Sequence, residues 1–110
     1  MTDNERTMLE FVAKACEYSV MWCKNGVEGD EEEGFLLTVH RWNPLENIDD
    51  CAEIETLLMI DVQWFPGLGI VQAKRGEYVW PVAYINDIEG RREARMRAVV
   101  NLAARLGREM

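Results

Sequence analysis

Apolar residues recur at helical spacing near the start of the chain. They lie at positions i, i+4, i+7 and i+8, which places them on one face of a helix. The side chain of Asp3 or Asn4 is expected to cap this helix, because short polar side chains accept hydrogen bonds from the first free N–H groups. The apolar face consists of Met8, Val12, Ala15 and Cys16.

The pattern then changes to β-branched and aromatic residues over 18–24 and again over 35–40. Asn25-Gly26 lies between these segments and is a strong turn signal. We therefore expect two antiparallel strands over 18–24 and 35–40. Residues 28–33 are nearly all acidic and are expected to form a solvated loop between them.

Trp42-Asn43-Pro44 is expected to end the second strand, since proline holds the preceding residue extended and cannot join a central ladder. A second helix is predicted over 48–60, with a cap at Asn47 or Asp49. Its predicted buried residues are Ile54, Leu57 and Leu58.

Two further strand-like segments follow the second helix. Residues 61–64 and 69–73 form either one strand bent at Phe65-Pro66-Gly67, or a strand and a following edge segment. Residues 78–85 form another strand, which Pro81 marks as an edge strand or a bulged one.

The C-terminal segment is predicted to be an amphipathic helix. Asn86 is its expected cap, and Glu89 completes a capping-box pattern. The predicted order α-β-β-α-β-β-α indicates an α+β fold, in which a small antiparallel sheet packs against helices in one compact domain over 1–110. The predicted buried face is Met96, Val99, Val100, Ala103 and Leu106.

Charge is segregated along the chain, whose formal net charge is −8. Residues 1–61 hold 15 acidic and 4 basic side chains, whereas residues 62–110 hold 5 acidic and 8 basic ones. Because phosphate neutralisation drives nucleic-acid affinity, direct nucleic-acid binding is not expected. Since no apolar run approaches the ~20 residues that span a bilayer, we expect a soluble, cytoplasmic protein without membrane contact.

Two parts of the sequence resemble a family of small phage-encoded proteins with an α/β sandwich domain. One is Trp42-Asn43-Pro44-Leu45 with Asp49-Asp50 at a helix start, and the other is the Arg/Ala-rich tail 91–110 that ends in Gly107-Arg108-Glu109-Met110. The resemblance covers roughly residues 5–110. It implies a phage genome and a bacterial host cytoplasm, and it implies no catalytic residues. The chain departs from the family pattern at Asp30 to Glu33 and at Phe65-Pro66-Gly67.

The residues that carry metal or nucleophilic chemistry are few. Cys16, Cys23, Cys51 and His40 are zinc-ligand types, but no two cysteines stand in a metal-binding pair, and burial in the core is the favoured interpretation. A Cys51/His40 nucleophile–base pair and acid–base catalysis by Asp49, Asp50 and Glu53 are weaker alternatives. We expect no enzyme activity, no metal and no cofactor.

The acidic run Asp30, Glu31, Glu32 and Glu33 has the sharpest functional interpretation. Closely spaced carboxylates can imitate a nucleic-acid backbone and occupy the basic groove of a partner protein. Trp42 either locks its turn or anchors that partner. The alternative site is a small-ligand pocket formed by His40, Arg41 and Trp42.

The arginines of the tail are interpreted first as the solvated face of a surface helix, paired in part with Glu89 and Glu93. They could instead bind acidic partners, including the acidic half of a second copy in a homodimer. The arginines are Arg91, Arg92, Arg95, Arg105 and Arg108.

Three of the four tryptophans, Trp22, Trp64 and Trp80, are expected in the core.

The sequence thus predicts a non-enzymatic phage accessory protein that binds a host protein. Its acidic surface would inhibit a nucleic-acid-handling or antiviral defence complex. A protein that binds or sequesters a small, nucleotide-like ligand is the alternative.

Overall fold

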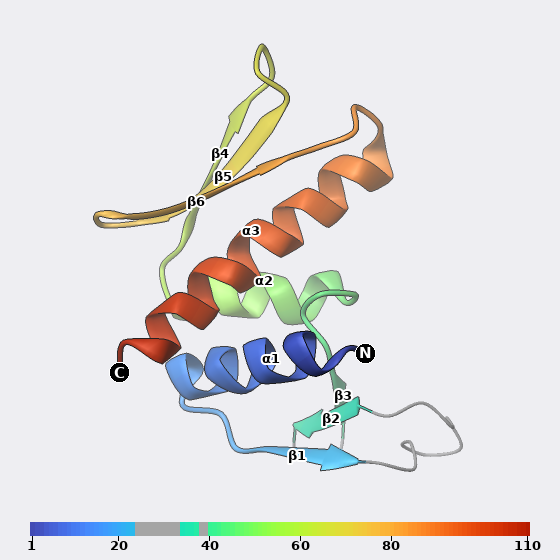
Figure 1. Ribbon diagram of the computed structural model, residues 1–110, viewed down its shortest axis with the longest axis vertical. Coiled ribbons are helices and arrows are strands. Elements are labelled where there is room, and N and C mark those ends of the chain that lie inside the picture. Colours follow the sequence, from blue (N-terminus) through green and yellow to red (C-terminus); the bar gives the residue numbers. More distant parts are fainter. Residues whose placement is uncertain (24–33, 38–39) are drawn as a thin grey trace.

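The computed structural model describes residues 1–23, 34–37 and 40–110, and these form an α+β fold with two three-stranded antiparallel sheets (Figure 1). The predicted class is therefore confirmed, and the order α-β-β-β-α-β-β-β-α contains two more strands than expected. The predicted loop 28–33 lies outside the described residues. The elements are α1 (Asp3–Cys16), β1 (Val20–Cys23), β2 (Gly34–Leu37), β3 (His40–Trp42), α2 (Ile48–Leu57), β4 (Asp61–Phe65), β5 (Ile70–Arg75), β6 (Tyr78–Ala83) and α3 (Ile88–Arg108).

The helix starts are set by side-chain caps. Thr2, rather than Asp3 or Asn4, caps α1 and forms a reciprocal capping box with Glu5. Asn47 caps α2 as predicted, through its side-chain oxygen. At α3 the cap is Asp87, which accepts from the backbone N–H of Gly90. The predicted Asn86–Glu89 capping box is wrong, because the helix starts one residue later and glycine occupies its third position.

The helix α2 ends before its predicted limit. Leu57 is its last residue, and Met59 has a φ of 53°, a left-handed conformation that an α-helix cannot continue. Ile54 and Leu58 are buried as predicted, whereas Leu57 is 50% exposed. The prediction for Leu57 fails because its side chain points outward in the last helical turn.

The first sheet has the order β1-β2-β3. The antiparallel pairing of the first two predicted strands is confirmed, with Trp22 opposite Phe35. The single strand predicted over 35–40 is wrong, because His40 pairs back onto Leu37 and starts β3. Residues 38–39, which join β2 to β3, lie outside the described residues.

The second sheet has the order β4-β5-β6. The prediction of one bent strand through Phe65-Pro66-Gly67 is wrong, because the chain reverses there and Phe65 pairs with Ile70. Gly69 adopts a φ of +64°, which glycine reaches without steric cost, and Leu68 N–H donates to the Phe65 carbonyl at 3.0 Å. The strand β6 is an edge strand, as Pro81 predicted.

The helix α3 runs through the centre of the fold, with α1 and α2 on one side and the second sheet on the other (Figure 1). Four of its five predicted core residues are buried, and Leu106 is partly buried. The helices α3 and α1 approach each other so closely that a Cβ on Gly107 would overlap the Phe11 carbonyl oxygen. None of the helices in the described part of the chain combines the length and apolar character that crossing a bilayer requires.

Candidate functional site

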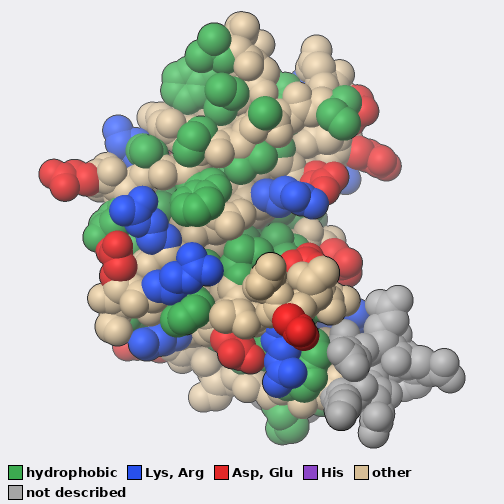
Figure 2. Space-filling model, in the orientation of Figure 1, with side chains coloured by type: hydrophobic (Ala, Val, Ile, Leu, Met, Phe, Trp, Pro, Cys, Tyr) green, Lys and Arg blue, Asp and Glu red, His purple; other side chains and the backbone are tan. Residues whose placement is uncertain are grey.

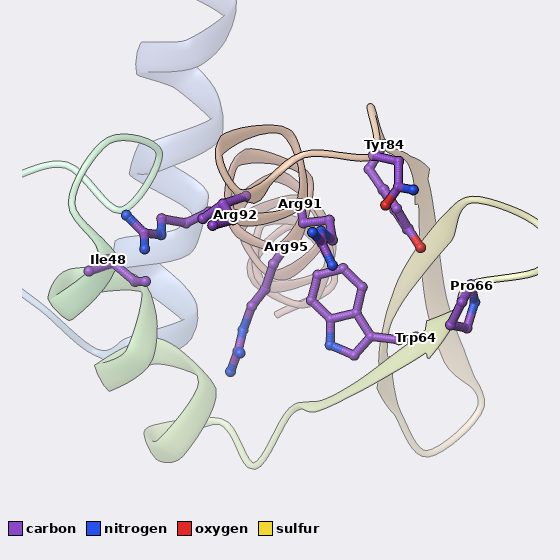
Figure 3. Close-up of a pocket in the computed structure, with 9 residues that line it drawn as sticks. Ile48, Trp64, Pro66, Tyr84, Arg91, Arg92 and Arg95 are labelled. Atoms are coloured by element: carbon purple, nitrogen blue, oxygen red, sulfur yellow. The ribbon is translucent and has the colours of Figure 1, made fainter.

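A pocket of about 500 Å³ lies between the end of β4, the start of α3 and the start of α2. This volume is within the range of small-molecule sites. One side is aromatic or apolar and the other carries arginines, so we call it the arginine–aromatic pocket (Figure 3). Its lining residues are Ile48, Trp64, Pro66, Tyr84, Asn86, Ile88, Arg91, Arg92 and Arg95.

The aromatic wall is formed by Trp64 and Tyr84. Trp64 pairs across the sheet with the fully buried Val71, so both side chains point to the face that α3 covers. Trp64 nevertheless stays 38% exposed, and the prediction of a core tryptophan is wrong there. It lies on edge strand β4, beyond the part of the sheet that α3 covers. The Trp64 and Tyr84 rings meet edge to face, with centroids 5.6 Å apart.

The cationic wall comes from the first two turns of α3. All three arginines line the pocket, but Arg91 and Arg95 lie on the side of Trp64, whereas Arg92 extends toward Ile48 of α2 (Figure 3). Arg95 forms an ion pair with Glu55, and Arg91 Nε donates to the Asp87 carbonyl at 3.2 Å. In the described part of the chain, Arg91 and Arg92 have no carboxylate partner. The pocket therefore carries an excess of positive charge in a protein of net charge −8.

Exposed apolar side chains gather at the end of the β4–β5 hairpin and where β6 leads into α3. On the face shown in Figure 2, hydrophobic side chains gather over the end of the β4–β5 hairpin, at the top of the view. Phe65 and Leu68 are exposed at this tip, and Ile85 is exposed where β6 leads into α3. The Tyr84 N–H donates to the Gly69 carbonyl at 2.9 Å and holds the two segments together.

The remaining arginines of α3 have structural contacts. Arg105 lies over the Tyr78 ring, and Arg108 lies over the Phe11 ring. The predicted pairing with Glu93 occurs, but with Arg97 at 2.9 Å. The arginines thus divide into three that face the pocket and others that cover the surface of the helix.

A signal for this pocket was present in the sequence. Cations stabilise the C-terminal end of a helix, where the dipole is negative, and three arginines near an N-terminus gain nothing from it. Arg91, Arg92 and Arg95 follow the Asp87 cap within two turns. Sequence reasoning treated them together with the C-terminal arginines and so did not separate them as a site.

The predicted ligand site His40, Arg41 and Trp42 does not form one pocket. Successive strand residues point to opposite faces, so Arg41 lies opposite Trp42. Trp42 is 1% exposed and packs edge to face against Tyr18 and Phe35, while His40 is exposed at the end of β3. Burial agrees with the interpretation that Trp42 locks its turn, and it leaves no indole surface for a partner.

The Trp-Asn-Pro-Leu element has a clear structural role. The Asn43 N–H donates to the Asp50 carboxylate at 2.9 Å, and the Asn43 side chain accepts from the Leu45 N–H at 3.1 Å. These bonds join the turn to the first turn of α2. Burial raises the pKa of Asp50, and the nearby carboxylates of Glu53 and Asp49 add to the rise, while the Asn43 hydrogen bond opposes it.

The buried thiols are poor nucleophiles. Burial raises the pKa of Cys51 to about 12 and that of Cys16 to about 11. Both thiols are therefore protonated near neutral pH, and Cys51 lies in the core while His40 is exposed. In residues 1–23, 34–37 and 40–110, no three histidine, cysteine or carboxylate side chains gather as a metal site would require.

The acidic run Asp30, Glu31, Glu32 and Glu33 lies outside the described residues. Comparison with protein-family models, with curated proteins and with solved structures found no match to the chain. The resemblance to phage proteins therefore stays a prediction.

Proposed function

We propose that the protein is a non-enzymatic binding protein, and that the arginine–aromatic pocket takes a small anionic ligand with a planar ring. The observation that carries this proposal is the convergence of two unlike walls. An exposed indole and a phenol ring line one side, and three guanidinium groups line the other. A ring can pack against Trp64 while an anion receives charge-assisted hydrogen bonds from Arg91 and Arg92.

The exposure of Trp64 also favours a binding role. An indole that is 38% exposed on the inner face of a sheet leaves apolar surface in contact with water. A ligand that covers this surface would gain the free energy of apolar burial, about 25 cal/mol per Å². The ring part of the ligand thus contributes affinity, and the anionic part fixes its orientation.

The chemistry of the site supports binding rather than catalysis. The pocket is lined by arginines, which stay protonated, by the Asn86 amide, and by aromatic and apolar side chains. A proton-transfer reaction needs a group whose pKa lies near neutrality. Under this proposal, sequestration of the ligand is the protein's activity, and the phage setting implied by the resemblance would place it in a host cell.

A second candidate function is the binding of a host protein through an acidic surface. The outward side of α2 supports it, because Asp49 and Glu53 are exposed there, together with Leu57 and Met59. Carboxylates attract a basic partner before contact, and the apolar side chains become buried once contact is made, so this mixture is typical of a protein–protein interface. The run Asp30, Glu31, Glu32 and Glu33 supports the same function from the sequence alone.

Calorimetric titration with 1-naphthyl phosphate, 1-naphthol and inorganic phosphate tests the main proposal. The compound that carries both ring and anion should bind at least tenfold more tightly than either part alone. Arg91→Gln with Arg92→Gln should weaken its binding about tenfold, because charge-assisted bonds are lost. Arg105→Gln with Arg108→Gln removes the same charge elsewhere on α3 and is the matched control.

A result in which the two double variants lose equal affinity would assign the effect to net charge and overturn the pocket. Trp64→Ala should also weaken binding, whereas Trp64→Phe should retain most of it because a planar ring remains. Thermal unfolding of each variant shows whether it is folded before it is titrated.

A further inference from the structure

We infer that the ligand of the arginine–aromatic pocket is a nucleoside di- or triphosphate, with its base at Trp64 and its phosphates at the arginines. This inference rests on the proposed function and narrows the ligand class. It follows from the charge of the three arginines, the shape of the aromatic wall, and the Asn86 amide in the pocket lining.

The charge on the cationic wall distinguishes phosphate chains from single carboxylates. Three arginines line the pocket, with Arg91 and Arg95 nearest to Trp64 (Figure 3), and Glu55 neutralises only Arg95. Within the described residues, two positive charges therefore remain to be compensated. A carboxylate supplies one negative charge and a phosphate monoester at most two, whereas a di- or triphosphate supplies more than two and can engage Arg95 as well. Guanidinium groups also match phosphate oxygens in a two-pronged geometry.

The aromatic wall fits a nucleobase. Trp64 and Tyr84 meet edge to face, and Trp64 retains exposed surface on the pocket side. Bases stack on such aromatic side chains with little dependence on sequence. A purine covers more of an indole than a pyrimidine does, so purine nucleotides should bind more tightly.

Asn86 supplies a polar side chain to the lining of the pocket. It lines the pocket at the start of the segment that leads into α3. A side-chain amide offers both a donor and an acceptor, which is the pattern that the adenine N6 and N7 atoms present. Asn86 therefore favours adenine over guanine at the base position.

Because the two walls belong to different elements, the pocket determines which end of the ligand lies on which side. Trp64 and Tyr84 belong to the sheet, whereas all three arginines belong to α3. A nucleotide with its base on the sheet side places its phosphates along the first two turns of the helix. The chain as a whole carries a charge of −8, which disfavours a long polyanion such as RNA more than it disfavours a compact nucleotide.

Titration of the full chain with adenosine, AMP, ADP and ATP in the presence of EDTA tests the inference. Affinity should rise at least tenfold from adenosine to ADP, and ATP should bind at least tenfold more tightly than inorganic triphosphate, which lacks a ring. Tryptophan fluorescence should change on binding to the wild type and much less in Trp64→Phe, since the other three indoles are more buried. Asn86→Ala should reduce the ratio of ATP to GTP affinity.

The outcomes separate this inference from the proposed function. If 1-naphthyl phosphate binds in the pocket but nucleotide affinity does not depend on the number of phosphates, the nucleotide assignment is wrong and the proposed function stands. If neither 1-naphthyl phosphate nor a nucleotide binds, both the nucleotide assignment and the proposed function are wrong. Tighter binding of an oligonucleotide than of ATP, or equal ATP binding by the Arg91→Gln/Arg92→Gln variant and its Arg105→Gln/Arg108→Gln control, would also overturn the inference.

Discussion

Arg95 and Glu55 form an ion pair of 2.7 Å that joins α3 to α2 beside the arginine–aromatic pocket. The Glu55 side chain is only 13% exposed, and its other oxygen lies 4.0 Å from the Cys51 sulfur. The pair therefore holds one of the three pocket arginines in a fixed position, and it lowers the positive charge that a ligand meets.

Replacing Glu55 by glutamine should change stability and ligand affinity in opposite directions. Loss of the ion pair should lower the free energy of unfolding by about 1 kcal/mol. Removal of the neutralising carboxylate should strengthen the binding of an anion severalfold, because Arg95 becomes available to it. Urea unfolding and calorimetric titration measure the two effects. Glu93→Gln breaks the exposed Arg97 pair and should change neither by more than about 0.5 kcal/mol.

Gly107→Ala should destabilise the protein, although alanine is normally the better helix former. A Cβ at Gly107 would overlap the carbonyl oxygen of Phe11, so α1 and α3 would have to separate. We expect a loss of about 1–3 kcal/mol in the free energy of unfolding. Gly67→Ala, at a turn position with open space around it, should be close to neutral. A Gly107→Ala protein as stable as the wild type would show that the two helices do not approach so closely.

Val99→Asp should prevent stable folding or cost several kcal/mol. The Val99 side chain is fully buried on the inner face of α3, where a carboxylate would have no partner. Val79→Asp makes the same chemical change at an exposed position of β6 and should cost under about 1 kcal/mol. Thermal melts of the two variants should therefore differ widely, and similar melts would contradict the assignment of this helix face to the core.

Asp50→Asn should show a stability gain that grows with pH. The pKa of Asp50 is raised in the folded protein by burial, so the proton binds more tightly to the folded state than to the unfolded one. The resulting stabilisation is complete below the ordinary value of 3.8 and is lost as the pH rises through the folded pKa.

Asparagine stays neutral and escapes that loss, while its side-chain oxygen can still accept from the Asn43 N–H. Unfolding curves from about pH 3 to pH 7 measure the difference between variant and wild type. Asp61→Asn removes the same charge at an exposed position of β4, away from the carboxylates that act on Asp50, and serves as the control. A difference that is constant over this range, or equal in both variants, would show that the Asp50 environment has no such effect.

Reversal of Asp30, Glu31, Glu32 and Glu33 to lysine tests the second candidate function. If the acidic surface binds a host protein, association should be fast and salt-sensitive, and the reversed variant should lose most of its association rate. Stopped-flow or surface-based kinetics at low and high salt measure this with a captured partner. Unchanged kinetics would exclude the acidic run as the contact.

Trp42→Ala should destabilise the fold rather than remove an exposed aromatic anchor. The indole is buried between Tyr18 and Phe35, so its removal should cost about 3–5 kcal/mol of stability. Any loss of binding in this variant would follow from unfolding. Loss of stability is therefore the expected result, and circular dichroism melts check it.

Local sequence signals determined much of the fold. The apolar spacing in α1 and α3 indicated which faces are buried, because residues three and four apart share one side of a helix. Asn47 identified the start of α2, because its side chain accepts hydrogen bonds from nearby backbone N–H groups. Pro81 identified an edge strand, because proline has no backbone N–H to donate. The α+β class followed from the order of these elements.

Only the tertiary structure decided where strands turn back and which side chains meet. The chain reverses after Phe65 because Gly69 allows a left-handed turn and the two flanking segments pair. In the sequence alone, the same residues are equally consistent with one bent strand. Trp64 is exposed because its strand lies at the sheet edge, beyond the cover of α3. Trp64 and Arg91 line one pocket although they lie far apart in the sequence, and such an arrangement depends on how a sheet and a helix pack rather than on local spacing.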